Sequence, residues 1–303
     1  MAPVSLTRRS FIASLAAFPV AGSLKAAAPA EEEIVDSHVH VWVHDPRYPW
    51  APETLHPPQR DASAETLLSH MDSTGVSRTV IIQVIHYRWD NRYVADVIRR
   101  FPDKFCGVAR VNPQDPGSPD TLSGLVENDH FQGVRLSPAG DASGDWIGGP
   151  LMAPLWQRCG QLRIPMTLLT PVSRLGSVAR WVDRFPEVAV VIDHMADSPL
   201  GSPAALSPLL ALARYPRVYV KVSHTWSLSR QAYPYTDAHV QIRRLYDAFG
   251  PRRLMAGTDW PLVEAYCSYP QAIDIVRNRV SFLSAEDRRW VCGATAKTLW
   301  RWS

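Results

Sequence analysis

Two histidines lie two residues apart near the start of the chain, at His38 and His40 in the segment DSHVH. The surrounding residues 34–41 read IVDSHVHV, a mostly apolar, valine-rich run typical of a strand buried on both faces. Side chains at positions i and i+2 of a strand point to the same side, about 6–7 Å apart. Two imidazoles at that spacing can share a metal ion or a substrate, whereas two unpaired buried imidazoles would cost desolvation energy. We therefore expect His38 and His40 to belong to a functional site.

Two more polar side chains follow apolar runs further along the chain. His194 comes directly after the run 187–193, and Asp259 follows the run 253–257 within the segment GTDWP. An aspartate at such a place is often only a turn or cap residue, and a histidine only a supporting group. In a parallel barrel, however, the ends of the strands meet at one face. The combination with the HxH pair therefore predicts one site built from four residues.

The rest of the chain contains the elements that would position this site. Short apolar runs predict eight strands, at 34–41, 79–85, 105–111, 132–136, 164–169, 187–193, 217–222 and 253–257. Amphipathic stretches between and after them predict helices at 64–73, 93–101, 172–185, 238–249, 269–280 and 284–300. This alternation favours an α/β fold, a single-domain (β/α)8 TIM barrel, over an open doubly wound sheet. No GxGxxG follows the first strand, which argues against a Rossmann fold.

Length, charge and cysteine content agree with an ordinary globular barrel. A chain of 303 residues fits one such barrel, since α/β barrels of about 250 residues are single domains. The three basic residues within 1–30 account for the whole formal charge of +3. No lysine or arginine stripe marks a phosphate-tracking face, so we expect no nucleic-acid partner. The four cysteines lie far apart and are expected to be free or buried thiols, with a long-range disulfide left open: Cys106, Cys159, Cys267 and Cys292.

Residues 1–30 resemble an export signal, and 31–303 form the expected barrel domain. Arg8 and Arg9 precede Ser-Phe-Ile, as in twin-arginine signal peptides. The apolar run 11–24 is shorter than the roughly 20 residues that a membrane-spanning helix needs. An Ala-Pro-Ala cleavage site follows and ends at Ala30. We expect the twin-arginine export machinery as a partner, no stable membrane span, and a periplasmic product that starts near Glu31.

The motifs DSHVHVW, VIDH and AGTDWP resemble those of the amidohydrolase superfamily (amidohydrolase-related family 2). The resemblance covers nearly all of 34–303 and is strongest to the branch that includes 2-pyrone-4,6-dicarboxylate lactonase and L-fuconolactonase. It implies that His38, His40 and Asp259 form the site, with His194 as the histidine of the sixth strand. The segments QGVR and VYVKVS also resemble strands four and seven of the family.

One departure from the family leaves the metal open. Many members carry a metal-binding Lys, Glu or His on strand five, where this chain reads IPMTLLT. The lactonase branch commonly lacks that residue, and some of its members act without a metal. His38, His40 and Asp259 with water could still hold a divalent metal, zinc or manganese.

Six further residues are candidates for binding a small-molecule substrate. Arg135 ends the fourth strand and could hold a carboxylate or carbonyl, although a structural ion pair is the alternative. His224 stands where the family usually has a small residue, and it could orient substrate or transfer a proton. The remaining candidates flank predicted strand ends: His86, Tyr87, Trp42 and Trp260. His86 and His224 could also be plain loop histidines.

The sequence thus predicts an amidohydrolase-type hydrolase acting on a lactone or related cyclic ester. Asp259 would take a proton from water, while His194 and the other histidines, with or without a metal, polarise the carbonyl. A metal-dependent decarboxylase of an aromatic or muconate-type acid is the alternative enzyme. An exported small-molecule-binding protein without turnover is a third hypothesis. The substrate and the oligomeric state stay open.

Overall fold

A computed structural model describes Met1, residues 33–137 and residues 146–302. The predicted export signal and its cleavage site therefore lie outside the described residues. So do residues 138–145, which follow the fourth strand in the sequence.

The described part of the chain contains eight parallel strands in two hydrogen-bonded groups. The first group has the order β1-β2-β3 and the second β4-β5-β6-β7-β8. Two isolated parallel bridges, Val39 with Trp260 and Ala109 with Val134, join the groups and close the ring. The bounds are β1 Ile34–Val39, β2 Val76–Ile82, β3 Phe105–Val108, β4 Val134–Leu136, β5 Met166–Leu168, β6 Val190–Ile192, β7 Val218–Val222 and β8 Leu254–Ala256.

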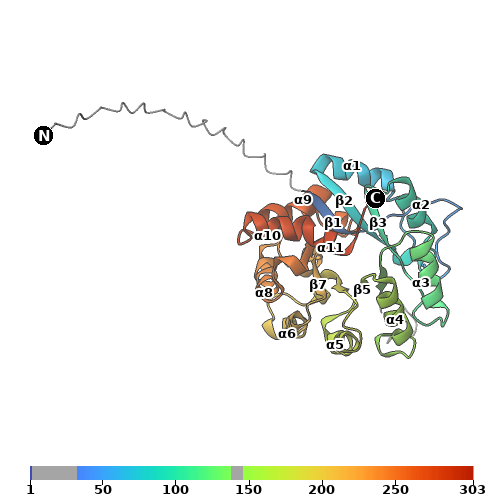
Figure 1. Ribbon diagram of the computed structural model, residues 1–303. Coiled ribbons are helices and arrows are strands. Elements are labelled where there is room, and N and C mark those ends of the chain that lie inside the picture. Colours follow the sequence, from blue (N-terminus) through green and yellow to red (C-terminus); the bar gives the residue numbers. More distant parts are fainter. Residues whose placement is uncertain (2–32, 138–145, 303) are drawn as a thin grey trace. The chain divides into compact units, whose positions relative to one another are not determined.

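Helices follow the strands and surround them (Figure 1). Their bounds are α1 Ala64–Thr74, α2 Arg92–Arg100, α3 Ser118–Glu127, α4 Met152–Leu162, α5 Leu175–Arg184, α6 Pro203–Ala211, α7 Thr225–Leu228, α8 His239–Phe249, α9 Tyr269–Asp274, α10 Ala285–Arg289 and α11 Thr295–Leu299. The predicted (β/α)8 barrel is confirmed, and each predicted strand lies within about three residues of an observed one.

The second strand differs from its prediction at both boundaries. The sequence predicts a start at residue 79, but β2 begins at Val76. Ser77 and Arg78 interrupt the apolar pattern, so the sequence does not indicate that the strand includes them. Both are nevertheless bonded to the neighbouring strand region, since Ser77 Oγ donates to the Ile34 carbonyl and Arg78 pairs with Glu33. The predicted helix 284–300 is also divided, with a π-helical segment between α10 and α11.

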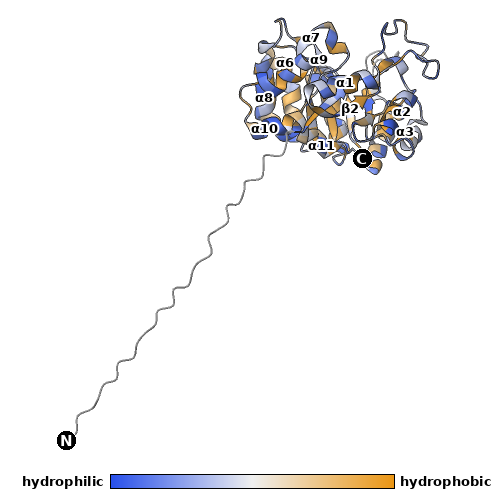
Figure 2. Cartoon of the chain, turned by 90° about the horizontal axis from the view of Figure 1, so that it is seen from above, coloured by the Kyte–Doolittle hydropathy of each residue, from blue (hydrophilic) through white to orange (hydrophobic). Residues whose placement is uncertain are grey.

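The barrel interior is apolar at the end where the strands begin. A buried cluster that begins there and reaches the last residues of β2 and β3 combines residues of β1, β2, β3, β6 and β8 with two residues from the end of the chain: Val35, Val80, Ile82, Cys106, Val108, Val191, Met255, Ala296 and Trp300. Trp300 is fully buried, and its indole lies next to Gly133, which immediately precedes β4. Figure 2 shows α11 and the C-terminus at one end of the barrel and α7, which follows β7, at the other.

Two further predictions concern the cysteines and membrane-spanning helices. All four cysteines are buried, as expected of thiols in a large core. Among the described residues, no helix has both the length and the apolar character that crossing a bilayer requires.

Candidate active site

The predicted residues converge where β1 and β8 end. Gly257 makes this possible, because a side chain there would bring a Cβ within 2.9 Å of the His38 Cβ. Two backbone hydrogen bonds then couple the strand ends, from Asp259 N to the His38 carbonyl and from His40 N to the Trp260 carbonyl. Both histidines and Asp259 are at most 5 % exposed.

Three polar side-chain atoms meet at the centre of the site. His38 Nε2 lies 3.3 Å from His40 Nε2 and 3.4 Å from Asp259 Oδ1. His40 Nε2 lies 3.2 Å from the same Asp259 Oδ1. That carboxylate oxygen is buried and receives no hydrogen bond of good geometry. A buried, unsatisfied anionic oxygen between two imidazoles is suited to a proton, a water molecule or a cation.

His224 binds the other oxygen of the same carboxylate. Its Nε2 lies 2.7 Å from Asp259 Oδ2, and its Nδ1 lies 3.2 Å from Asp197 Oδ1. Burial lowers the pKa of His224, but the hydrogen bonds to the two aspartates outweigh it and raise the pKa to about 9. His224 is therefore a cation at neutral pH. Burial raises the pKa of Asp259, yet the His224 hydrogen bond and the neighbouring histidines hold it well below its usual range.

His194 lies face to face with His224, with ring centroids 3.5 Å apart and planes within 5°. Its Nδ1 is 2.8 Å from Ser223 Oγ, and its centroid is 4.5 Å from that of His38. Burial and the positive charge of His224 hold the pKa of His194 well below its usual range, so this ring is neutral.

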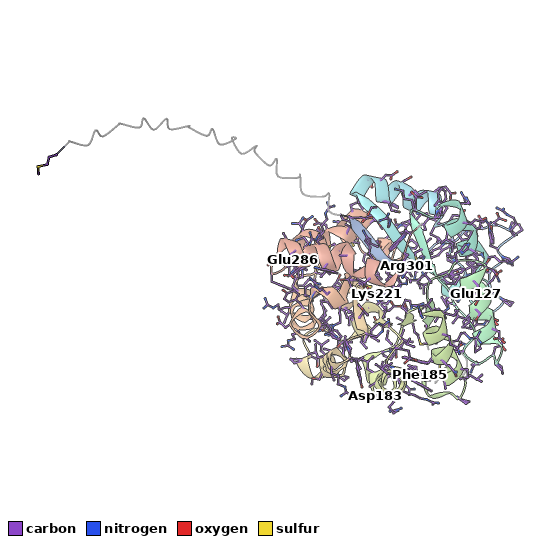
Figure 3. The ribbon with its side chains drawn as sticks, viewed as in Figure 1. Glu127, Asp183, Phe185, Lys221, Glu286 and Arg301 are labelled. Atoms are coloured by element: carbon purple, nitrogen blue, oxygen red, sulfur yellow. The ribbon has the colours of Figure 1, made fainter. Side chains whose placement is uncertain are left out.

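Three charged residues lie behind His38, on its Nδ1 side. Lys221 Nζ is 3.1 Å from His38 Nδ1 and 3.0 Å from Asp193 Oδ1. Arg135 Nε donates to Asp193 Oδ2 at 3.2 Å. Figure 3 labels Lys221 within the ring of strands. Burial and the nearby Lys221 charge lower the pKa of His38 to about 3, so His38 is neutral.

The turns that carry the site adopt strained backbone conformations. His194, His224 and Asp259 all have left-handed φ values, of 52°, 60° and 62°. Such a conformation costs a non-glycine residue on the order of 1–2 kcal/mol. The Asp259 turn is held by Asp36, whose carboxylate accepts hydrogen bonds from Thr258 N at 2.9 Å and Thr258 Oγ1 at 2.6 Å. Strain that the surroundings compensate in this way is typical of functional sites.

The amidohydrolase family sequence model matches residues 35–302. The chain belongs to the amidohydrolase family. It is 30% identical to L-fucono-1,5-lactonase of Burkholderia ambifaria over 236 residues, which cover 75% of this chain and 80% of that protein. It is 25% identical to 4-sulfomuconolactone hydrolase of Hydrogenophaga intermedia, over 75% of this chain and 74% of that one.

A solved structure shares the fold of this amidohydrolase. It is an amidohydrolase of Burkholderia multivorans with bound zinc, with a TM-score of 0.74 and 21% sequence identity. The alignment covers 88% of this chain and 98% of that one. The predicted family and the prediction of an enzyme are thereby confirmed.

The structure brings five predicted residues of the amidohydrolase together: His38, His40, His194, His224 and Asp259. Arg135 is linked to this group by its ion pair with Asp193.

The other candidates lie around the edge of this cluster. His86 is half-buried, and the ring centroids of Trp42 and Trp50 lie 6.0 Å and 6.1 Å from its own. Tyr87 Oη donates to the Val43 carbonyl, and Trp42 Nε1 donates to the Arg60 carbonyl, so both fasten the loop 44–60.

Trp260 is buried beside the site without turning its ring into it. Its Nε1 donates to Glu264, and its ring packs against His70. What Trp260 supplies to the cluster is its backbone carbonyl, which accepts the hydrogen bond from His40 N.

Sequence reasoning gave no role to Lys221 and Asp193, which carry the buried charges of the site. Two features of the sequence could have pointed to these residues. A lysine in the middle of the apolar strand VYVKV has no packing reason to be there, and Asp193 directly precedes His194. Their meeting at His38 depends on how β1, β6 and β7 align, which single runs of sequence do not reveal.

The amidohydrolase site has donors suited to a divalent metal. His38, His194 and Asp259 each offer a ligand atom, and the three atoms lie within 4.8 Å of one another. His40 Nε2 borders the same space, and Asp259 Oδ1 is a buried oxygen without a hydrogen bond. Imidazole nitrogens and a carboxylate are the donors that zinc accepts.

Proposed function

We propose that this amidohydrolase hydrolyses a lactone or a related cyclic ester. The observation that carries the proposal is the Asp259 carboxylate, which offers a buried oxygen without a hydrogen bond beside two histidines. Support comes from two relatives that are named for hydrolysing lactones and that align over three-quarters of the chain.

Asp259 would act as the general base. Its low pKa keeps it ionised at neutral pH, and His224 holds Oδ2 so that Oδ1 stays directed at the histidine pair. A water molecule beside Oδ1 could transfer a proton to it while attacking the ester carbonyl. The same oxygen would then return this proton to the leaving alkoxide.

The histidines would stabilise the negative charge that develops on the carbonyl oxygen. His224 contributes a positive charge within the site, and His38 and His194 contribute neutral rings that can donate a hydrogen bond. Preorganised donors of this kind act strongly because the site is buried. We further propose His86 and His224 as substrate contacts, since both are partly exposed beside the cluster.

A zinc or manganese ion would be held by His38, Asp259 and either His40 or His194. When bound, such an ion supplies Lewis acidity, polarising a carbonyl and lowering the pKa of water. The zinc bound to the related Burkholderia multivorans amidohydrolase supports this part of the proposal.

The proposal is tested with purified enzyme and a panel of sugar-acid lactones and dicarboxylic lactones. Lactone opening releases an acid, whereas decarboxylation consumes a proton and releases CO2. Titration at constant pH therefore separates the two reactions. We expect alkali uptake with lactones, and one ¹⁸O atom in the product carboxylate when the reaction is run in labelled water. CO2 release from aromatic or muconate-type acids with no lactone opening would establish the decarboxylase alternative. Ligand binding without any product would favour the binding-protein alternative.

We also propose that the enzyme is exported through the twin-arginine pathway. The sequence features in support are Arg8-Arg9, the short apolar run and the Ala-Pro-Ala site. N-terminal sequencing of the periplasmic fraction is expected to find a start near Glu31. Export that survives a combined Arg8→Lys and Arg9→Lys change would contradict the proposal.

A further inference from the structure

The hydrogen positions on the two strand-one histidines follow from their outer partners. His40 Nδ1 lies 2.7 Å from the Ile82 carbonyl oxygen. A carbonyl only accepts, so Nδ1 carries the hydrogen. His40 Nε2 faces His38 Nε2 at 3.3 Å and Asp259 Oδ1 at 3.2 Å.

The hydrogen position of His38 follows from its partner at Nδ1. Lys221 Nζ makes a hydrogen bond of good geometry to His38 Nδ1 at 3.1 Å. An ammonium group only donates, so His38 Nδ1 accepts and the hydrogen of the neutral ring is on Nε2. That hydrogen faces Asp259 Oδ1 at 3.4 Å and His40 Nε2 at 3.3 Å. The Lys221 contact therefore favours the form in which His38 Nε2 is a donor.

Asp193 favours the form of His38 that has its hydrogen on Nδ1. Its Oδ1 lies 3.3 Å from His38 Nδ1 but forms no hydrogen bond of good geometry in this structure. If the His38 hydrogen moved to Nδ1, it would be donated to this carboxylate, and the Nε2 lone pair would be free to bind a metal. Both arrangements are neutral and differ only in which nitrogen carries the hydrogen.

We propose that Lys221 and Asp193 compete for His38 Nδ1 and thereby set whether His38 is a hydrogen-bond donor or a metal ligand. Lys221 is a positioning residue that favours the donor form, which suits carbonyl polarisation without a metal. Asp193 favours the ligand form. This control of metal binding by His38 goes beyond lactone hydrolysis and does not depend on which substrate is turned over.

The test measures zinc affinity of the metal-stripped enzyme by competition with a chromophoric chelator. Lys221→Met is expected to bind Zn²⁺ more tightly than the wild type, and Asp193→Asn more weakly. Changes beside a metal-binding histidine typically alter metal affinity about 10- to 100-fold. Arg135→Met is the matched control, because it removes a positive charge from Asp193 without touching His38. Its effect on affinity is expected to be smaller than that of Lys221→Met.

A second measurement reads the hydrogen position directly. Two-bond ¹⁵N–¹H correlation spectra of histidine-labelled enzyme distinguish the two neutral forms, and His38→Gln assigns the signal. The metal-free wild type is expected to show His38 with its hydrogen on Nε2, and Lys221→Met to show it on Nδ1. A wild-type hydrogen on Nδ1 overturns the proposal, as does zinc affinity that stays unchanged or falls in folded Lys221→Met. If Lys221→Met does not fold, the wild-type spectrum alone decides.

Discussion

The two ends of the barrel interior differ sharply in chemistry, although the same strands supply both. β1 contributes Val35 at one end and His38 at the other, and β6 contributes Val191 before it leads into Asp193. The end where the strands begin is an apolar cluster that includes the fully buried Trp300. The end where they finish contains buried charged and ionisable groups.

Lys221 lies at the boundary between these ends. Its ammonium contacts Asp193 and His38, while its Nζ is 5.6 Å from the centre of the Trp300 ring. Burying charged groups costs solvation energy, and burying apolar area provides the free energy that offsets it. We infer that the apolar end mainly stabilises the fold and that the polar end mainly performs the chemistry. Variants at each end can test this division.

The largest effect on activity is expected at the polar end, from Asp259→Asn. The amide keeps the shape of the side chain but cannot accept a proton from water. Loss of a general base typically costs about 10²–10⁴-fold in rate. Steady-state kcat on the best lactone measures this, and urea unfolding should show a stable protein. A folded variant with full activity would remove Asp259 from the mechanism.

At the apolar end, Trp300→Ala should affect stability instead. Truncating a buried tryptophan typically costs about 3–5 kcal/mol of unfolding free energy. The indole packs within the apolar cluster and lies 5.6 Å from Lys221 Nζ, a group that takes no direct part in the proposed reaction, so kcat of the folded fraction should stay close to that of the wild type. Urea unfolding and kcat are measured on the same preparation. If that variant is unfolded, Trp300→Phe gives the same comparison with a smaller cavity. A large fall in kcat with little loss of stability would show that the two ends are not separate.

A smaller loss of activity is expected for His224→Gln. Glutamine can still donate to Asp259 but carries no positive charge. Removing one preorganised group that stabilises an oxyanion typically costs about 10²–10³-fold in kcat, and the retained hydrogen bond should place this variant near the lower limit. His224→Asn, which is too short to reach the same oxygen, is the matched control and should be slower. Equal kcat in all three proteins would leave His224 as a loop histidine.

The sequence predicted the barrel and the residues at strand ends better than the contacts between strands. His38, His40 and Asp259 were found because an HxH pair and a GTDWP turn are informative without any knowledge of neighbours. Arg135 was a candidate for holding a substrate carboxylate or carbonyl, with a structural ion pair as the alternative, and in the structure it donates to Asp193. The sequence does not show this contact, because β4 and β6 both pair with β5 and not with each other. The Arg135 and Asp193 side chains meet only once the strands are arranged in the barrel.

The smallest expected effect concerns the loop 44–60, which polar contacts hold at the polar end. His44 contacts Asp61 through Nδ1 at 2.5 Å and the Pro58 carbonyl through Nε2 at 2.8 Å. The hydrogen bond to Asp61 raises the pKa of His44 above its ordinary value of 6.5. The contribution of His44 to loop order is therefore fully present below pH 6.5, and it is lost as the pH rises through the raised pKa.

Hydrogen exchange of the loop amides, corrected for intrinsic rates, measures this contribution. Protection should begin to fall above pH 6.5 in the wild type, as the imidazolium loses its charge. His44→Gln, which has no charge to lose, should show lower protection at pH 6 and a flat profile. The apolar end provides the internal reference, since α11 amides have no such titrating partner and should keep the same protection in both proteins. Parallel profiles for the loop in the two proteins would mean that the His44 charge does not order it, and that the loop is held by its tyrosine and tryptophan contacts instead.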